Sequence, residues 1–450
     1  MEQQTAADAA HLSGVVASFA QYSLFANEEA DKRARHLAQL GPPAAGLLPV
    51  GAISKRIEGM RAAAELNQAL LDDCIDLAGL TSLAARAVGV RSETPDEAAA
   101  PASPAPSSRG TSPASARPTS GWLDEVAGAG GERSHGAFVL APPHHVGKTR
   151  KALHQVAREW SEEGKPERDA SFGRVLRALA EHLPARPRGQ EGSGGAAAEA
   201  SGAVPAGVSD RTRRPRVLVP GAGMGRLVLD VAAAGYSSVG CEFSYQMLLL
   251  GAAMLNGGRQ WPVAPWAEEA CNLWDADSQL RRCTVPDVLA AEVAADAAAR
   301  GWELDMSMAA GEFAEAFAAE EHASAFDAVA ACFFLDTAVV PSEYLATVAH
   351  VLRPGGLLVG IGPLQFHWAA PPACSKGASK ADPTVLGADR WDRSVELTWE
   401  EMKAAMALAG LRLVKEERVE RVPYCSNPRS MRPNEYGAVL FVAERTPPSR

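Results

Sequence analysis

The chain has 450 residues, of which 47% are hydrophobic and 22% charged, a balance typical of globular proteins with a sizeable core. Its formal net charge of −10 argues against a nucleic-acid partner, which would need a basic face larger than the short run 211–216. The polar N-terminus does not fit a secretory signal, and no apolar run approaches the ~18 residues that span a bilayer. Seven scattered cysteines without a CxxC pair predict neither a disulfide framework nor a metal site. We therefore expect no membrane partner and a cytoplasmic protein, with the nucleus as a second location.

Residues 1–83 predict a helical region. Val15, Phe19 and Tyr22 recur at the spacing of one helix face, and a second helix is expected over residues 54–77.

Three segments have a loose composition. Residues 84–135 are rich in Ala, Pro and Ser and predict a disordered linker, because such a composition buries too little apolar surface to offset its ordering entropy. Residues 186–214 predict a second flexible linker, and a further loop is expected at 369–386. Between the two linkers, residues 136–185 predict a helical cap with a helical pair over 149–183.

From residue 215 to 450 short strand-like runs alternate with helices, beginning with the β-branched run at 216–220. Strands are expected at 216–220, 237–242, 326–334 and 357–362, and helices at 226–234 and 342–352. This alternation predicts βαβ units on a parallel sheet, hence an α/β fold of the Rossmann-like type.

The C-terminal part departs from this alternation. Thr398 and Glu401 form a capping box for a helix over 399–409, and the runs 411–419 and 436–444 then follow as two strands. Two consecutive strands without a helix between them predict an antiparallel hairpin at the end of the sheet.

A glycine-rich turn follows the first of the predicted parallel strands. Gly221, Gly223 and Gly225 allow a sharp turn before the next helix, and Glu242 ends the following strand. An acidic side chain at that position can accept hydrogen bonds from ribose hydroxyls. The dinucleotide fingerprint would require glycine at position 226, which is arginine, so the pattern favours an adenosylmethionine-dependent methyltransferase. A dinucleotide oxidoreductase and a degenerate, non-catalytic fold remain as alternatives.

Several stretches on both sides of this turn resemble the carnosine N-methyltransferase (N2227-like) family. The matching stretches are AELNQALLDDCID, REWSEEGKPERDA, VLVPGAGMGRL, CEFSYQML, MAAGEF, ACFFLDTA, LRPGG, IGPLQFH and YGAVLFV. The resemblance implies a class I methyltransferase sheet, S-adenosyl-L-methionine as cofactor, and methylation of the imidazole of carnosine to give anserine. At least one relative also methylates histidine in proteins, so a small imidazole dipeptide and a protein histidine both stand as acceptors.

The resemblance also assigns site residues by position. The residues that it implies in contact with the cofactor are Gln155, Arg158, Gly221, Glu242, Glu312, Phe313 and Cys332. Gly223 and Gly225 complete the glycine turn of this cofactor site. It implies a substrate pocket made by Asp336, His367 and Tyr436.

Three positions depart from the family pattern. The family commonly has aspartate where this chain has Glu312, and tyrosine where this chain has Phe366. Val339–Val340 replace a polar pair. The last two departures affect the expected acceptor more than the type of reaction.

Methyl transfer to a neutral imidazole requires positioning and no metal. Asp336 is the candidate that accepts the ring N–H, and His367 is the candidate that orients the ring or takes the departing proton; we predict both as catalytic. Tyr436 would hydrogen-bond the substrate. The alternatives are a helix cap for Asp336, a hydrogen-bonded loop histidine for His367 and hairpin packing for Tyr436. Cys332 is equally compatible with a buried apolar role.

Two other functions remain open. One is a protein-histidine N-methyltransferase whose N-terminal helices dock the partner, and the other is a non-catalytic interaction protein that retains the fold. The sequence is compatible with a homodimer and does not specify the oligomeric state.

Overall fold

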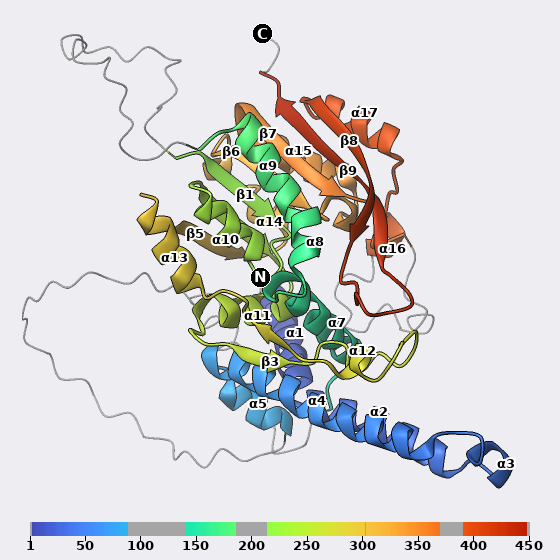
Figure 1. Cartoon of the computed structure of the whole chain (residues 1–450). Coiled ribbons are helices and arrows are strands. Elements are labelled where there is room, and N and C mark those ends of the chain that lie inside the picture. The colour runs from blue at the N-terminus through green and yellow to red at the C-terminus, as the bar shows by residue number, and fades with distance from the viewer. Residues whose placement is uncertain (1, 89–139, 186–213, 302, 370–389, 448–450) are drawn as a thin grey trace, which may run out of the picture.

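The computed structural model describes residues 2–88, 140–185, 214–301, 303–369 and 390–447. Its centre is a seven-stranded sheet in the order β5-β2-β1-β6-β7-β9-β8 (Figure 1). The strands are β1 (Arg216–Pro220), β2 (Ser237–Glu242), β5 (Asp305–Ala310), β6 (Phe326–Cys332), β7 (Leu352–Gly362), β8 (Leu411–Pro423) and β9 (Glu435–Arg445). The first five are parallel to one another, whereas β9 runs antiparallel to β7 and to β8. The predicted α/β sheet with a C-terminal antiparallel hairpin is confirmed.

Helices cover both faces of this sheet, so its central strands are buried on both sides. In β1, Val217 and Val219 pack on one face and Leu218 packs on the other. The first face is covered by α9 (Phe172–His182) and α10 (Arg226–Ala233). The second is covered by α14 (Phe313–Ala316), α15 (Pro341–Val351) and α17 (Trp399–Leu408).

Most predicted elements agree with the structure, and the differences have local causes. The capping box before α17 is present, with Thr398 N donating to Glu401 Oε2 at 2.8 Å. The strand expected over 326–334 ends at Cys332, because Phe333 adopts a left-handed φ of 53°. β7 begins earlier than expected, and its pairing passes from Leu352 to Leu357 through an irregularity in the ladder.

The N-terminal region is helical, as predicted, but is divided differently. It comprises α1 (Glu2–Ala20), α2 (Tyr22–Ala38), α3 (Pro42–Ala45), α4 (Val50–Leu77) and α5 (Thr81–Val88). Tyr22 begins α2 and so does not share a helix with Val15 and Phe19, although all three are buried. Residues 84–88, expected in the linker, belong to α5. The remainder of both predicted linkers, up to residue 213, and most of the loop at 369–386 lie outside the described residues.

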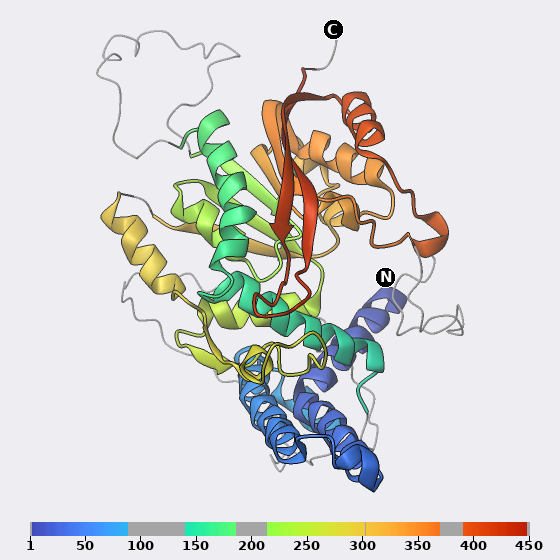
Figure 2. The ribbon, with the colours of Figure 1, turned by 45° about the vertical axis from the view of Figure 1, so that its right-hand side comes forward.

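The predicted helical pair consists of three helices: α7 (Pro143–Trp160), α8 (Lys165–Ala170) and α9. The chain turns sharply between α7 and α8 at Gly164. Only glycine fits there, because a Cβ would collide with the carbonyl oxygen of Arg158. α7 packs against α1 and against α11 (Tyr245–Asn256). Figures 1 and 2 show the N-terminal helices α1 to α5 at one end of the sheet, next to α11.

The segment between β2 and β6 carries elements that the sequence did not predict. They are α11, α14 and the sheet strand β5, together with a small sheet of β3 (Trp261–Val263) and β4 (Cys283–Val285), α12 (Asp277–Leu280), α13 (Ala290–Ala299) and the 3-10 turn Glu320–His322. Later come the 3-10 turn Leu335–Thr337 and α16 (Arg390–Arg393). Within the described ranges, no helix combines the length and the apolar character needed to cross a bilayer.

Candidate functional site

The glycine-rich turn joins β1 to α10. Gly221, Gly223 and Gly225 all have left-handed backbones, with φ of 61°, 57° and 81°. A Cβ on Gly223 would lie 2.6 Å from Glu159 Oε1, and one on Gly221 would lie 2.6 Å from a ring carbon of Phe334. Backbone conformation and close packing therefore both require glycine in this turn.

Glu242, at the end of β2, lies against this turn. Its Oε2 accepts a hydrogen bond from Gly223 N at 2.9 Å, and its Oε1 accepts from Phe243 N at 2.9 Å and from Ser244 N at 2.8 Å. Burial raises the pKa of Glu242 to about 7, although these three N–H groups oppose the shift. A carboxylate offers about four lone-pair sites, so Glu242 keeps acceptor capacity for a ligand.

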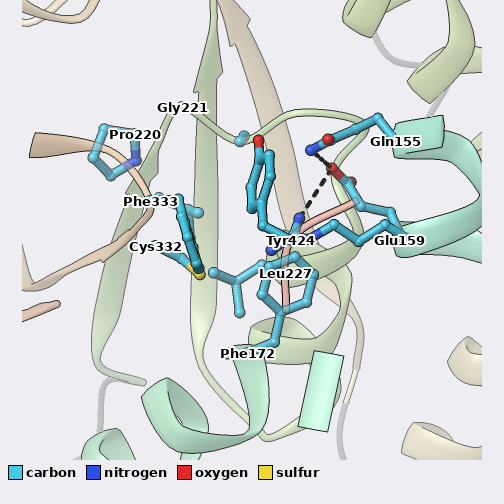
Figure 3. Close-up of a pocket in the computed structure, with 12 residues that line it drawn as sticks. Gln155, Glu159, Phe172, Pro220, Gly221, Leu227, Cys332, Phe333 and Tyr424 are labelled. Atoms are coloured by element: carbon cyan, nitrogen blue, oxygen red, sulfur yellow. Dashed lines mark hydrogen bonds and ion pairs between the residues drawn. The ribbon is translucent and has the colours of Figure 1, made fainter. Parts of the chain in front are cut away.

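A cavity lies beside the turn, between α7 and the end of β6 (Figure 3). Four of the predicted cofactor residues line it: Gln155, Arg158, Gly221 and Cys332. Its wall also contains side chains that the sequence did not single out, namely Glu159, Phe172, Leu227, Phe333 and Tyr424. Figure 3 shows Gln155 and Glu159 close together on α7, with Tyr424 and Phe333 across from them. The predicted cofactor residues on α7, β1 and β6 thus converge, although they are far apart in sequence.

Arg158 is a buried cation at the centre of this wall. The residue is 4% exposed, and its guanidinium lies 4.7 Å from the ring centre of Tyr424 and 4.8 Å from that of Phe172. Two carboxylates lie near, Glu159 at 3.8 Å and Glu167 at 3.7 Å. Both distances exceed those of a hydrogen bond, so the guanidinium can still bind an anionic ligand group.

Glu159 connects α7 to the glycine turn. Its Oε1 accepts from Gln155 Nε2 at 2.8 Å, and its Oε2 accepts from Met224 N at 3.1 Å, at the N-terminal end of α10. Burial raises the pKa of Glu159, and the positive charge of Arg158 opposes this. The i, i+4 spacing of Gln155 and Glu159 was a sequence signal that could have identified this residue.

Glu312 and Phe313 lie at the end of β5, beside the end of β2. The two strand ends are joined by Gly311 N, which donates to the carbonyl oxygen of Glu242 at 2.9 Å. The Glu312 carboxylate caps α14 by accepting from Ala314 N at 2.8 Å. Phe313 is 3% exposed, with its ring packed in the core. Both residues are outside the lining of the cavity, so their predicted contact with adenine stays a prediction.

Asp336 follows Phe333 by three residues, in the 3-10 turn after β6. It is 3% exposed, and its Oδ2 accepts from Gln365 N at 2.9 Å. Its carbonyl oxygen accepts from His367 N at 3.0 Å, which joins the loops after β6 and β7. The N-cap of α15 is Val340, so the alternative of Asp336 as a helix cap is wrong. Burial raises the pKa of Asp336 to about 6.

His367 and Tyr436 complete the predicted acceptor side. Desolvation and then the positive charge of Lys151 lower the pKa of His367, which favours its neutral ring. The Tyr436 ring centre lies 6.1 Å from that of Phe333 and 6.3 Å from that of Tyr424. These contacts place Tyr436 next to the cavity wall and are compatible both with substrate contact and with hairpin packing. Across the described ranges, no cluster of three or more His, Cys, Asp or Glu side chains is arranged to hold a metal ion.

Comparison with known sequences identifies the family. Residues 203–447 match the family model described as carnosine N-methyltransferase, which is more than half of the 450 residues. The chain belongs to the carnosine N-methyltransferase family. The carnosine N-methyltransferase of Dictyostelium discoideum is 31% identical over 306 residues, covering 67% of this chain and 55% of that protein. The enzyme of that name from Mus musculus is 29% identical over 318 residues, covering 70% and 67%. This chain therefore spans between 55% and 67% of the length of these two relatives.

Solved structures of low sequence identity also align with the chain. A methyltransferase from Methanosarcina mazei is 15% identical, with a TM-score of 0.29, and covers 52% of this chain and 93% of its own. The 1,6-didemethyltoxoflavin-N1-methyltransferase of Burkholderia thailandensis is 14% identical, with a TM-score of 0.30, and covers 68% and 92%. The family assignment rests on the sequence comparisons and not on these alignments.

Proposed function

We propose that this chain transfers the methyl group of S-adenosyl-L-methionine to an imidazole nitrogen of carnosine, with anserine as product. One observation carries the proposal. The cavity beside the glycine turn has Phe333 in its wall, and the buried carboxylate of Asp336 follows three residues later on the same loop. Membership of the carnosine N-methyltransferase family supports the same acceptor.

The donor set around the turn fits the cofactor chemically. Glu242 already accepts three backbone N–H groups, one of them from Gly223 of the turn, and keeps acceptor capacity on Oε2 for one ribose hydroxyl. Arg158 provides a cation for the α-carboxylate, and Gln155 provides an amide in the same wall. When bound, S-adenosylmethionine supplies an activated methyl group on a sulfonium.

The acceptor needs a neutral ring with one nitrogen lone pair aimed at the methyl carbon. In our proposal, the Asp336 carboxylate accepts the ring N–H, which fixes the tautomer and leaves the opposite nitrogen bare. The hydrogen bond from Gln365 N holds the Asp336 carboxylate in place. Phe333, Tyr424 and Tyr436 would enclose the ring and exclude water.

The charge balance assigns a second task to the same carboxylate. As the N–C bond forms and the S–C bond breaks, the ring becomes cationic while still carrying its N–H. Asp336 stabilises that charge, and the proton then leaves through Asp336 or His367 to solvent. The carboxylate must be ionised for both tasks, which its pKa of about 6 allows near neutral pH.

The decisive experiment incubates the purified chain with labelled S-adenosylmethionine and separate acceptors, followed by product mapping. The acceptors are carnosine, free histidine, a histidine-containing peptide and a methyl-depleted cell extract. Labelled anserine supports the proposal. Label on the protein histidines of the extract alone would instead favour a protein-histidine methyltransferase. Absence of cofactor binding by calorimetry would leave a non-catalytic protein with the same fold.

A further inference from the structure

The loop between β8 and β9 approaches the cavity in a strained conformation. Cys425 has a left-handed φ of 46°, a backbone conformation that is unfavourable for a non-glycine residue. Phe333, at the end of β6, is likewise left-handed. The rings of Phe333 and Tyr424 meet, with centres 4.6 Å apart. The two facing rings therefore lie on or next to residues with a strained backbone. Other contacts must stabilise this conformation of the loop.

The carboxylate of Glu167, on α8, holds the loop. Its Oε2 accepts from Cys425 N at 2.8 Å, and its Oε1 accepts from Ser426 N at 2.9 Å. Consecutive N–H groups around a left-handed residue form a concave anion site, which the carboxylate fills with both oxygens. Glu167 is 7% exposed, so water competes little for these bonds.

The same region joins the loop to the cofactor side of the cavity. Glu167 Oε2 lies 3.7 Å from Arg158 Nε, and Cys425 Sγ donates to Gln155 Oε1 at 2.8 Å. The Tyr424 ring in turn packs 4.7 Å from the Arg158 guanidinium. Both α7 residues assigned to the cofactor are therefore connected to the loop that carries Tyr424.

We propose that Glu167 is a positioning residue that fixes residues 424–426 over Arg158, so that Tyr424 forms the wall facing the methyl acceptor. The expected change in kcat/KM rests on the proposed function, whereas the expected change in the conformation of residues 424–426 does not. A glutamine at 167 keeps one acceptor oxygen but turns its NH2 toward the second backbone N–H, so one of the two bonds is lost.

The test compares Glu167→Gln with Glu162→Gln, which makes the same charge change at an exposed position of the same segment. We expect Glu167→Gln to lower kcat/KM for carnosine about 10- to 100-fold, the size associated with a hydrogen bond to a charged group. Calorimetry should find the cofactor Kd within about threefold of wild type, because Arg158 keeps its charge. Hydrogen exchange should show the amides of Cys425 and Ser426 losing protection, with those of β8 unchanged.

A rescue experiment separates positioning from a general loss of structure. Glycine adopts a left-handed φ without strain, so Cys425→Gly added to Glu167→Gln should recover part of the lost kcat/KM. If Glu167→Gln does not accumulate as folded protein, Glu167→Asp keeps the charge and both oxygens and takes its place, with a smaller expected loss.

The outcomes distinguish this inference from the proposed function. Wild-type kcat/KM and unchanged exchange at Cys425 and Ser426 in Glu167→Gln would overturn the positioning role. A wild-type chain that does not methylate carnosine would overturn the function, and the exchange measurement would still decide the role of Glu167. Equal kinetic loss in Glu162→Gln would attribute the effect to net charge and also overturn the inference.

Discussion

Replacing Asp336 by asparagine tests the acceptor side most directly, because the shape is kept and the charge is removed. The asparagine oxygen can still accept from Gln365 N, which in the native chain donates to Asp336 Oδ2 at 2.9 Å. We therefore expect the free energy of unfolding to change by less than about 1 kcal/mol, the size of an ordinary net hydrogen bond. The variant can no longer offer an anionic acceptor to an imidazole N–H.

The kinetic loss follows from that missing charge. Hydrogen bonds to charged groups contribute about 1.5–3 kcal/mol, and about 1.4 kcal/mol corresponds to a factor of ten. We expect kcat/KM for carnosine to fall about 10- to 150-fold, and more if the asparagine NH2 group favours the wrong tautomer. The cofactor Kd should stay within about twofold of wild type, because Asp336 is outside the cofactor cavity.

The assay measures initial rates with labelled cofactor at saturating concentration, over a range of carnosine concentrations. Calorimetry of the cofactor and chemical denaturation of both proteins provide the controls. Wild-type kcat/KM in a folded Asp336→Asn protein would refute the role of the carboxylate. If the cofactor affinity fell by the same factor as the rate, Asp336 would contribute to binding the cofactor and not to binding the methyl acceptor.

Three further predictions follow from the same geometry. At saturating cofactor, wild-type kcat/KM should decline as pH falls through about 6, because burial raises the pKa of Asp336 to about 6 and only the ionised carboxylate is competent. The pH–rate profile of Asp336→Asn should lose the titration of this carboxylate. It should keep the titration of the free imidazole of the substrate, near 6.5. Above pH 8, where a carboxyl with a pKa of about 7 is ionised, Glu242→Ala should weaken cofactor binding about 10- to 100-fold, since it removes the charged acceptor beside the turn. Unchanged affinity by calorimetry would contradict the ribose assignment. Gly223→Ala should lower the free energy of unfolding by about 1–3 kcal/mol, because its φ is 57° and the new Cβ would meet the Glu159 carboxylate. Gly147→Ala, at a position in α7 where a Cβ meets nothing within 4 Å, should be neutral or stabilising in the same denaturation experiment.

Local chemistry made much of the sheet predictable. The strand over residues 237–242 and the capping box of α17 were predicted at their observed positions, because the alternation of strands with helices and helix capping are read from near neighbours. The segment between β2 and β6 was not predicted. Its helix α11 and its short strands β3 and β4 pack on the N-terminal helices, and partners so distant in sequence leave no periodic signal.

The candidate site divides in the same way. Gly221, Gly223 and Glu242 follow from a turn pattern at strand ends, and the structure brings them together. Tyr424 and Glu159 were missed, because their importance lies in contacts across the chain. Glu159 reaches Met224 N, and Tyr424 reaches Arg158 only because β8 lies at the far end of the sheet and returns its loop over α7.

The sequence by itself determined the α/β fold class, the C-terminal hairpin, the glycine turn with its acidic partner, and the family resemblance. These depend on periodicity, turn chemistry and spacing, which are local properties of the chain. Only the tertiary structure decided which buried charges face one another, how the loop after β8 closes over the cavity, and which carboxylates are desolvated. Burial and distance between remote segments set those properties, and neither is encoded within any one stretch of sequence.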